Sequence, residues 1–416
     1  MEVQGTPKEQ MNLGFKRQAK KNRAEANTHQ IPDAGKNMQY DLYKSPLLRV
    51  YTEIEDGHMR MKTSGAASIL MRKNLAKNLS IFEGEKPAKV EADRLICSTW
   101  MPPIPSPGFD RLVKSQLSSI RGKMIPDQVT ISITEECPNN CIHCALPDTK
   151  NRAKLTTETV KSTIDQILEM GTTFVIFDGG EPLTYPGLED LIRYVDPEKA
   201  ITGMFTSGVG LTEERARSLK EAGLYSLTVS FDSAYEDKHD YVRGRKGVFK
   251  SAVEAVKSGL KAGLLVNIYV VLSRDNVNEL EELHTLAAKL GVHELSFYEI
   301  VPTGRWMDRA SEIMTPEDMR KFDNFVSRVR EKEGPRVFAI PQVMKATGCM
   351  AGRKWLHITP EGNILPCACI PIPYGNVHRD KVRDIWKKIR EDPAYNAKCC
   401  LMRNPEFREK YLKIRE

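Results

Sequence analysis

The chain has 416 residues, of which 40% are hydrophobic and 28% charged, an ordinary composition for a protein with a large buried core. It contains no apolar run near the roughly 20 residues that a membrane-spanning helix needs, and its N-terminus lacks the apolar core of a secretory signal. We therefore expect a cytosolic protein with one large α/β domain and additions, whose nine cysteines act as metal ligands or reactive thiols before they form disulfides.

The formal net charge of +7 is unevenly distributed along the chain. Residues 1–125 hold 21 Lys and Arg against 13 Asp and Glu, whereas the remaining residues are close to neutral. The basic excess therefore lies before the regular part of the chain. This distribution argues against a nucleic-acid-binding enzyme and favours a local contact of the N-terminal region with an anionic partner.

The first 125 residues divide into two parts. Residues 1–40 are rich in Lys, Gln, Asn and Ala, which predicts a mobile basic tail. Residues 41–125 predict an N-terminal helical extension with an amphipathic basic helix, whose apolar face consists of Met71, Leu75, Leu79 and Phe82. We expect this helix either to pack on the following domain or to lie on an anionic membrane surface.

Strand-like and helical patterns alternate from residue 129 onward. The strands are predicted at residues 129–134, 173–180, 200–208, 226–232, 264–273 and 294–302. Helical patterns occupy the segments between them, for example at 248–262 and about 278–290. Strands that alternate with helices favour a parallel sheet, which right-handed crossovers curl into a barrel or partial barrel. Ligands bind such folds at the C-terminal ends of the strands.

Two further regions follow the predicted barrel. Residues 307–345 contain a linking helix, for which Thr315 is the expected N-cap and Pro316 the first helical residue. Residues 346–416 contain five of the nine cysteines.

Cys137, Cys141 and Cys144 follow the first predicted strand directly, in "ECPNNCIHC". A structural zinc site needs four ligands, generally as two separated pairs, and only three thiols are present here. Three thiolates can also hold a cubane iron–sulfur cluster in which one iron lacks a protein ligand. Taken alone, the three cysteines leave a cluster, a zinc site and inert thiols open.

The second predicted strand ends in "FDGGEP", where Gly179 and Gly180 allow a ligand to approach the backbone and Glu181 supplies a carboxylate. By itself, this motif is usually a strand-to-helix turn. The combination of a C-x3-C-x2-C loop after strand one with GGEP after strand two resembles the radical S-adenosylmethionine (SAM) superfamily over about residues 129–305. The resemblance implies a partial (β/α)6 TIM-like barrel, with the radical SAM core at residues 126–306.

The resemblance also implies a chemistry. SAM would bind the open iron of a [4Fe–4S] cluster, and one electron would cleave SAM to methionine and a 5′-deoxyadenosyl radical that takes hydrogen from a substrate. A one-electron donor such as ferredoxin or flavodoxin would supply the electron. The residues that the resemblance assigns to SAM are His143, Gly179, Gly180, Glu181, Ser207, Ser230, Asp232, Arg243 and Val301. For Ser207 a turn, and for Arg243 a structural ion pair, remain open alternatives.

The C-terminal cysteines resemble the opening of the SPASM and twitch extensions of radical SAM enzymes. Cys349 and Cys367 flank "ITPEGNILP", which the resemblance implies to be a hairpin. The later cysteine run of a full SPASM domain is absent, so we expect one auxiliary [4Fe–4S] cluster rather than two. Its expected ligands are Cys349 and Cys367, with Cys369 and one of Cys399 and Cys400. A structural zinc site on the same thiols is the alternative.

The sequence does not name the substrate. Enzymes with auxiliary clusters often modify peptides, whereas the basic N-terminal region suggests a peripheral membrane contact and a lipid substrate. A step in cofactor or tetrapyrrole biosynthesis is a further alternative, and a C-methyltransferase is disfavoured because no cobalamin-binding domain is apparent. A zinc-stabilised binding protein without enzymatic activity would leave GGEP and the β/α series unexplained.

Overall fold

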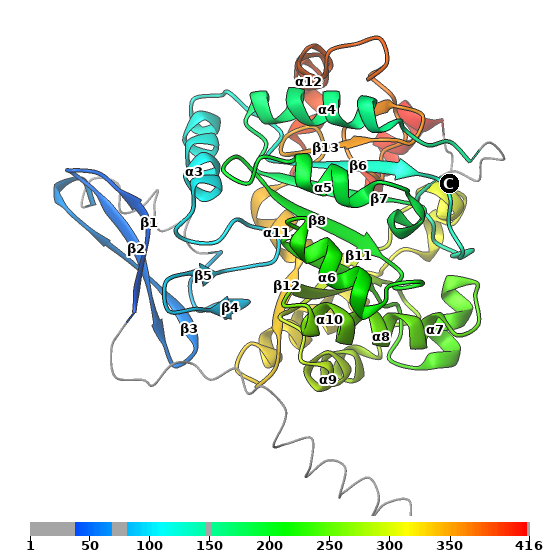
Figure 1. Cartoon of the computed structure of the whole chain (residues 1–416), viewed down its shortest axis with the longest axis horizontal. Coiled ribbons are helices and arrows are strands. Elements are labelled where there is room, and N and C mark those ends of the chain that lie inside the picture. Colours follow the sequence, from blue (N-terminus) through cyan, green and yellow to red (C-terminus); the bar gives the residue numbers. More distant parts are fainter. Residues whose placement is uncertain (1–37, 69–80, 147–151, 414–416) are drawn as a thin grey trace, which may run out of the picture. The chain divides into compact units, whose positions relative to one another are not determined.

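A computed structural model describes residues 38–68, 81–146 and 152–413 (Figure 1). Most of the predicted basic tail and most of the predicted helix at residues 71–82 lie outside these ranges. None of the described helices is long and apolar enough to cross a membrane.

Six parallel strands form the centre of the largest sheet, and they are the six that the sequence predicts. Each pairs with its neighbour in chain order, as expected for successive right-handed crossovers. Their bounds are β6 (Gln128–Thr134), β7 (Phe174–Gly179), β8 (Ile201–Thr206), β9 (Ser226–Ser230), β10 (Leu265–Leu272) and β11 (Glu294–Glu299). The prediction of a partial TIM-like barrel is confirmed.

The helices between these strands lie on the outer face of the sheet (Figure 1). Their bounds are α4 (Thr157–Met170), α5 (Leu188–Tyr194), α6 (Glu213–Glu221), α7 (Glu236–Arg243), α8 (Val248–Lys261) and α9 (Leu280–Leu290). In α4, Thr156 caps the N-terminus by accepting a hydrogen bond from the Thr159 amide. The side of α4 that carries Val160, Ile164 and Ile167 is buried, so the apolar periodicity of the sequence fixes which face of α4 meets the sheet. Helix α7 was not predicted.

The C-terminal region extends the same sheet. Helix α10 (Pro316–Val329) begins at the predicted N-cap Thr315, with a capping box completed by Asp318. β12 (Arg336–Ala339) then adds to β11, and β13 (Trp355–Ile358) adds in parallel to β6. β13 pairs antiparallel with β14 (Asn363–Leu365), which pairs with β15 (Gly375–Asn376), so the expected hairpin is present. The remaining helices are α11 (Ile340–Thr347), α12 (Val382–Glu391) and α13 (Pro405–Phe407).

The N-terminal extension contains strands where the sequence analysis expected helical structure. β1 (Gln39–Lys44), β2 (Arg49–Glu55) and β3 (His58–Ser64) form an antiparallel sheet, and β4 (Lys89–Val90) pairs with β5 (Leu95–Ile96). Asp56 and Gly57 both have positive φ, the geometry of the tight turn that an Asp-Gly pair favours between antiparallel strands. The pair Asp56-Gly57 is a sequence signal for a hairpin, which the expectation of a helical extension did not take into account. Helix α3 (Pro107–Ile120) follows the Pro-rich segment and was not predicted either.

Candidate active site

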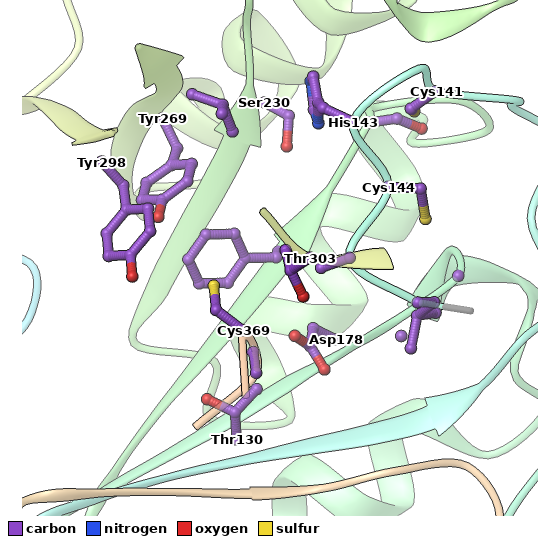
Figure 2. A pocket seen from close by; sticks show the side chains of 18 of the residues that line it. Thr130, Cys141, His143, Cys144, Asp178, Ser230, Tyr269, Tyr298, Thr303 and Cys369 are labelled. Atoms are coloured by element: carbon purple, nitrogen blue, oxygen red, sulfur yellow. The ribbon is translucent and has the colours of Figure 1, made fainter. Parts of the chain in front are cut away.

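A cavity of about 570 Å³ lies at the C-terminal ends of the parallel strands. Its lining includes the cysteine loop that follows β6, the glycines that follow β7, and residues that follow β8 and β11. Cys367 and Cys369, which follow β14, also line this cavity. The cavity therefore brings both groups of cysteines to one space (Figure 2).

The GGE segment after β7 is the first of three elements that hold the cysteine loop. The Gly180 amide donates to the Thr134 carbonyl at 2.7 Å, and the Glu181 amide donates to the Glu136 carbonyl at 2.7 Å. A Cβ atom on Gly180 would lie 2.3 Å from the Glu136 carbonyl oxygen. The absence of a side chain at Gly180 is therefore needed for the loop to pass this close to the strand end.

The end of α7 is the second element. The Asn140 amide donates to the Arg243 carbonyl and the Ile142 amide to the Val242 carbonyl, both at 3.0 Å. Gly244 has φ +62°, and a Cβ there would lie 2.3 Å from the Asn140 carbonyl oxygen. The motif "YVRG" thus ends the helix and lets it pack directly on the cysteine loop.

The segment after β11 is the third element. The Arg305 amide donates to the Cys144 carbonyl at 2.9 Å, and the Arg305 guanidinium donates to the Cys141 carbonyl at 3.2 Å and to the Asn140 side chain. Backbone and guanidinium contacts from two strand ends and from the end of helix α7 therefore determine the conformation of the loop, although the loop itself has no regular secondary structure.

Glu181 is 1% exposed, and described groups surround its carboxylate. Oε1 accepts from the Thr206 hydroxyl at 2.6 Å, and Oε2 accepts from the amide and the hydroxyl of Ser207 at 2.8 and 2.6 Å. Burial raises the pKa of Glu181, and the hydrogen bonds from Ser207 and Thr206 oppose this. Glu181 does not belong to the cavity lining, whereas Gly179, Gly180 and Ser207 do. Its expected contact with SAM stays a prediction; what it visibly does is join the ends of β7 and β8.

Asp232 links two other residues that the sequence analysis assigned to SAM. Its carboxylate lies 2.7 Å from Nε of Arg243 and 3.0 Å from Nε2 of His143. Burial alone would raise the pKa of Asp232, but the charges of Arg243 and His143 outweigh it and hold that pKa well below its usual range. The Arg243 guanidinium also lies 3.8 Å from Sγ of Cys141, so this buried group reaches the cysteine loop.

Of these three, His143 and Arg243 line the cavity, as do the predicted residues Ser230 and Val301. Two unpredicted lining residues, Asn139 and Thr303, each carry a buried oxygen that finds no hydrogen-bond partner among the described residues. Buried polar atoms normally have a partner. Unpartnered oxygens beside the cysteine loop, together with the glycines that leave its backbone accessible, fit a polar ligand such as SAM.

Four of the five C-terminal cysteines gather in two hydrogen-bonded pairs. A hydrogen bond with Cys400 lowers the pKa of the Cys349 thiol to about 6. Hydrogen bonding to Cys369, followed by burial, raises the pKa of Cys367. The charge of Cys349 acts on Cys367, and the charge of Cys367 acts on Cys400, so the pairs are neighbours. Cys399, by contrast, is exposed.

This thiol arrangement bears on the kind of metal group that could bind. No three Cys, His, Asp or Glu side chains in the described ranges converge as ligands of a single metal ion. Four thiols spread over two pairs are a suitable donor set for a cluster, whose irons are ligated separately. The three cysteines of the loop after β6 are likewise a suitable donor set for a cluster rather than for a single metal ion.

The cavity also contains residues that the sequence analysis missed. Asp178 accepts a hydrogen bond from the Ser132 hydroxyl at 2.6 Å, and that hydroxyl lies 3.3 Å from Nε2 of the buried His357. Burial raises the pKa of Asp178, with His357 opposing. Figure 2 shows Tyr269 and Tyr298 on the side opposite Cys141 and Cys144, and Asp178 between these two sides, near Cys369. Position immediately before GGEP was the only signal for Asp178, and nothing in the sequence singled out the tyrosines.

Trp100, also missed, closes part of the cavity. Its ring contacts those of Phe174, Phe205, Tyr269 and Phe338, with centroid separations of 5.8–6.3 Å, and its indole nitrogen donates to the Ser296 hydroxyl at 3.0 Å. A segment of the N-terminal extension therefore enters the inside of the sheet.

Comparison with known proteins identifies two family models. The Radical SAM superfamily model matches residues 131–287, and the SPASM model, an iron–sulfur cluster-binding domain, matches residues 349–411. AdoMet-dependent heme synthase of Methanosarcina barkeri is 28% identical over 306 residues, which cover 66% of this chain and 87% of that protein. PqqA peptide cyclase of Bradyrhizobium diazoefficiens is 28% identical over 267 residues, with coverage of 62% and 70%.

Two solved structures share the fold. Streptococcus suis SuiB bound to precursor peptide SuiA has a TM-score of 0.56 at 14% sequence identity, covering 86% of this chain and 90% of SuiB. The structure of anSMEcpe with bound AdoMet has a TM-score of 0.51 at 16% identity, covering 62% and 80%.

These findings set aside the non-enzymatic zinc protein, because both matched models describe iron–sulfur domains and the relatives are enzymes. The cofactors are SAM, a SAM-binding [4Fe–4S] cluster and auxiliary iron–sulfur. The chain is therefore a radical SAM enzyme, with a Radical SAM domain over residues 131–287 and an iron–sulfur cluster-binding SPASM domain over residues 349–411.

Proposed function

We propose that this enzyme abstracts hydrogen from a peptide substrate held between the two cysteine sites. The observation that carries the proposal is that one cavity is lined both by Cys137, Cys141 and Cys144 and by Cys367 and Cys369. When bound, the first cluster supplies the electron that cleaves SAM to a hydrogen-abstracting radical. The chain's own residues bind and orient the cofactor and substrate and exclude water.

At the first site, we propose that Cys137, Cys141 and Cys144 are the cluster ligands and leave one iron to SAM. The backbone of Gly179 and Gly180, both in the cavity lining, supports a role in binding the methionine part of SAM. Since Nε of Arg243 is paired with Asp232, its terminal nitrogens are the ones available to the methionine carboxylate. His143 is expected beside the adenine, with its ring oriented by Asp232.

At the second site, we propose that Cys349, Cys367, Cys369 and Cys400 are the four ligands of one auxiliary cluster. The two thiol pairs support this set, and the exposed position of Cys399 argues against it as a ligand. The choice between the adjacent cysteines, which the sequence left open, thus falls on Cys400.

The polarity of the substrate side supports a peptide over a lipid chain. Tyr269, Tyr298, Thr130 and Asp178 bring hydroxyl and carboxyl groups into the lining. An alkyl chain would leave these groups without partners, which is costly in a closed site, whereas peptide amides can both donate to them and accept from them. Nothing in the described ranges supports a membrane contact.

The charges in the lining also argue against a tetrapyrrole carboxylate as substrate. The lining arginines, Arg152, Arg243 and Arg305, lie at or near the cysteine loop that binds the cofactor. Glu299 and Asp178, in contrast, are acidic, and Arg403 already pairs with Glu299. The described part of the lining therefore offers the carboxylates of a polycarboxylate no arginine or lysine at the substrate end.

The proposal can be tested in two steps. The anaerobically purified enzyme is first assayed for iron, sulfide and 5′-deoxyadenosine formed from SAM and dithionite, beside Cys141→Ala. We expect the variant to lose SAM cleavage; cleavage at the wild-type rate would contradict the role of the loop. The enzyme is then incubated with a library of short synthetic peptides, and products are sought by mass spectrometry. Turnover of alkyl-chain lipids but of no peptide would contradict the peptide assignment.

A further inference from the structure

The outer side of the cysteine loop carries an exposed surface that neither SAM nor substrate binding uses. It consists of Tyr241, Arg245 and Lys246 at the end of α7, none of which lines the cavity, and we call it the α7 surface. Tyr241 is 74% exposed, the largest exposed fraction among the large hydrophobic residues of the described ranges. An aromatic ring in this position adds nothing to the core, whereas its burial against a partner would be favourable.

The α7 surface is joined to the cysteine loop through the main chain. Val242 and Arg243, the residues after Tyr241, accept the amides of Ile142 and Asn140, both at 3.0 Å. The Arg245 guanidinium donates to the Pro138 carbonyl at 3.1 Å. A protein that covers the α7 surface would therefore lie directly against the segment between Cys137 and Cys144.

The charge of the α7 surface is basic. Arg245 and Lys246 are exposed, and neither forms an ion pair with another residue of the described ranges. The neighbouring Asp240 forms an ion pair with neither of them; its two oxygens accept the amides of Gly247 and Phe249. Two exposed cations beside an exposed tyrosine are suited to an acidic partner.

We propose that the α7 surface is the docking site of a small acidic one-electron carrier protein. The proposal rests on the proposed function, because the cluster must receive one electron for each SAM that it cleaves. Electron transfer slows steeply with distance, and SAM and substrate occupy the cavity side of the loop. The outer side therefore offers the short route. Redox partners commonly bind through small interfaces of less than about 1,200 Å², which suits a surface of this kind.

The test compares a protein reductant with a small-molecule reductant. The double variant Tyr241→Ala/Lys246→Glu and the wild type are each assayed for 5′-deoxyadenosine formation, once with reduced flavodoxin and once with dithionite. We expect the flavodoxin-driven rate at low salt to fall about tenfold in the variant, because charge reversal removes electrostatic steering. The dithionite-driven rate should stay within about twofold, since a small ion needs no docking site.

A matched control uses another exposed tyrosine and lysine. Tyr194 on α5 is 39% exposed, and Nζ of Lys161 lies 5.1 Å from its ring centroid. Tyr194→Ala/Lys161→Glu makes the same chemical change on the outer helices and should leave both rates unchanged.

Binding of oxidised flavodoxin, measured by isothermal titration calorimetry, provides a readout that does not depend on turnover. We expect the affinity to fall in the α7 variant and with added salt, but not in the control variant. An unchanged affinity and flavodoxin-driven rate would overturn the proposal, as would an equal loss with both reductants. If the wild type fails to cleave SAM even with dithionite, the proposed function is contradicted, while the titration still tests the docking site.

Discussion

The two cysteine sites of this enzyme are built in opposite ways. The thiols of the loop after β6 are exposed or half-buried, and contacts from other strand ends hold the loop around them. The C-terminal thiols Cys349, Cys367 and Cys400 are buried, and Cys369 is half-buried. The difference suits their tasks: a site that must admit a ligand depends on its surroundings for shape, whereas a site with four protein ligands can be closed.

The first prediction tests whether the C-terminal site is complete. We expect Cys400→Ser to lose about half of the bound iron, because a cubane with a weakened fourth ligand is unstable. Cys399→Ser should keep its iron, because Cys399 is exposed and outside the proposed set. Iron and sulfide analysis with electron paramagnetic resonance checks both. The reverse pattern would assign the fourth ligand to Cys399.

The second prediction tests whether packing shapes the loop after β6. Gly244→Ala would bring a Cβ to 2.3 Å from the Asn140 carbonyl oxygen, so we expect SAM cleavage to fall by roughly 100-fold as the loop shifts. Gly247→Ala is the matched control, because Gly247 also has positive φ but has no atom within 4 Å of the added Cβ. Similar loss in both variants would indicate backbone strain rather than the contact with the loop.

The third prediction concerns the junction of β7 and β8. Glu181→Gln removes the negative charge that the Thr206 and Ser207 groups surround, and one of the two acceptor oxygens becomes a donor. We expect the KM for SAM to rise about tenfold or more, since hydrogen bonds to a charged group contribute about 1.5–3 kcal/mol. Ser207→Ala keeps the carboxylate and its bond to Thr206 and should raise KM only about threefold. Steady-state kinetics with dithionite measures both KM values. An equal increase in the two variants would contradict a special role of the Glu181 carboxylate in SAM binding.

The smallest effect is on stability rather than catalysis. His239 is buried against Phe231 and Phe249, and Asp232, Asp240, Arg243 and His143 are the charged groups that act on it. Burial, aided by Arg243, lowers the pKa of His239 to about 4. The unfolded chain therefore binds a proton below about pH 6.5 that the folded chain does not, and stability decreases as the pH falls from about 6.5 towards 4.

This contribution amounts to about 2 kcal/mol between pH 7 and pH 5. Thermal unfolding at the two pH values measures it, and His239→Gln should show a smaller drop in Tm on acidification than the wild type. An identical drop would assign the pH dependence to other groups.

Much of the barrel was predictable because its signals are local. Strands of apolar residues alternate with amphipathic helices, so all six strands of the barrel and the buried face of α4 could be identified from periodicity. Capping chemistry placed the start of α10 at Thr315. The predictions failed where the local pattern was short. The only local signal for the three-stranded sheet at residues 39–64 was the Asp-Gly turn, and α7 has only eight residues, most of them polar, so it shows no clear apolar periodicity.

By itself, the sequence indicated the chemistry of the first site, because Cys137, Cys141, Cys144 and GGEP lie at the ends of two successive strands and their spacing can be read along the chain. Only the tertiary structure brought Cys367 and Cys369 to the same cavity and paired Cys349 with Cys400. It also brought Trp100, Asp178, Tyr269 and Tyr298 together from four segments. The physical reason is the parallel pairing of β13 with β6, a contact between residues more than 200 positions apart that no local pattern encodes.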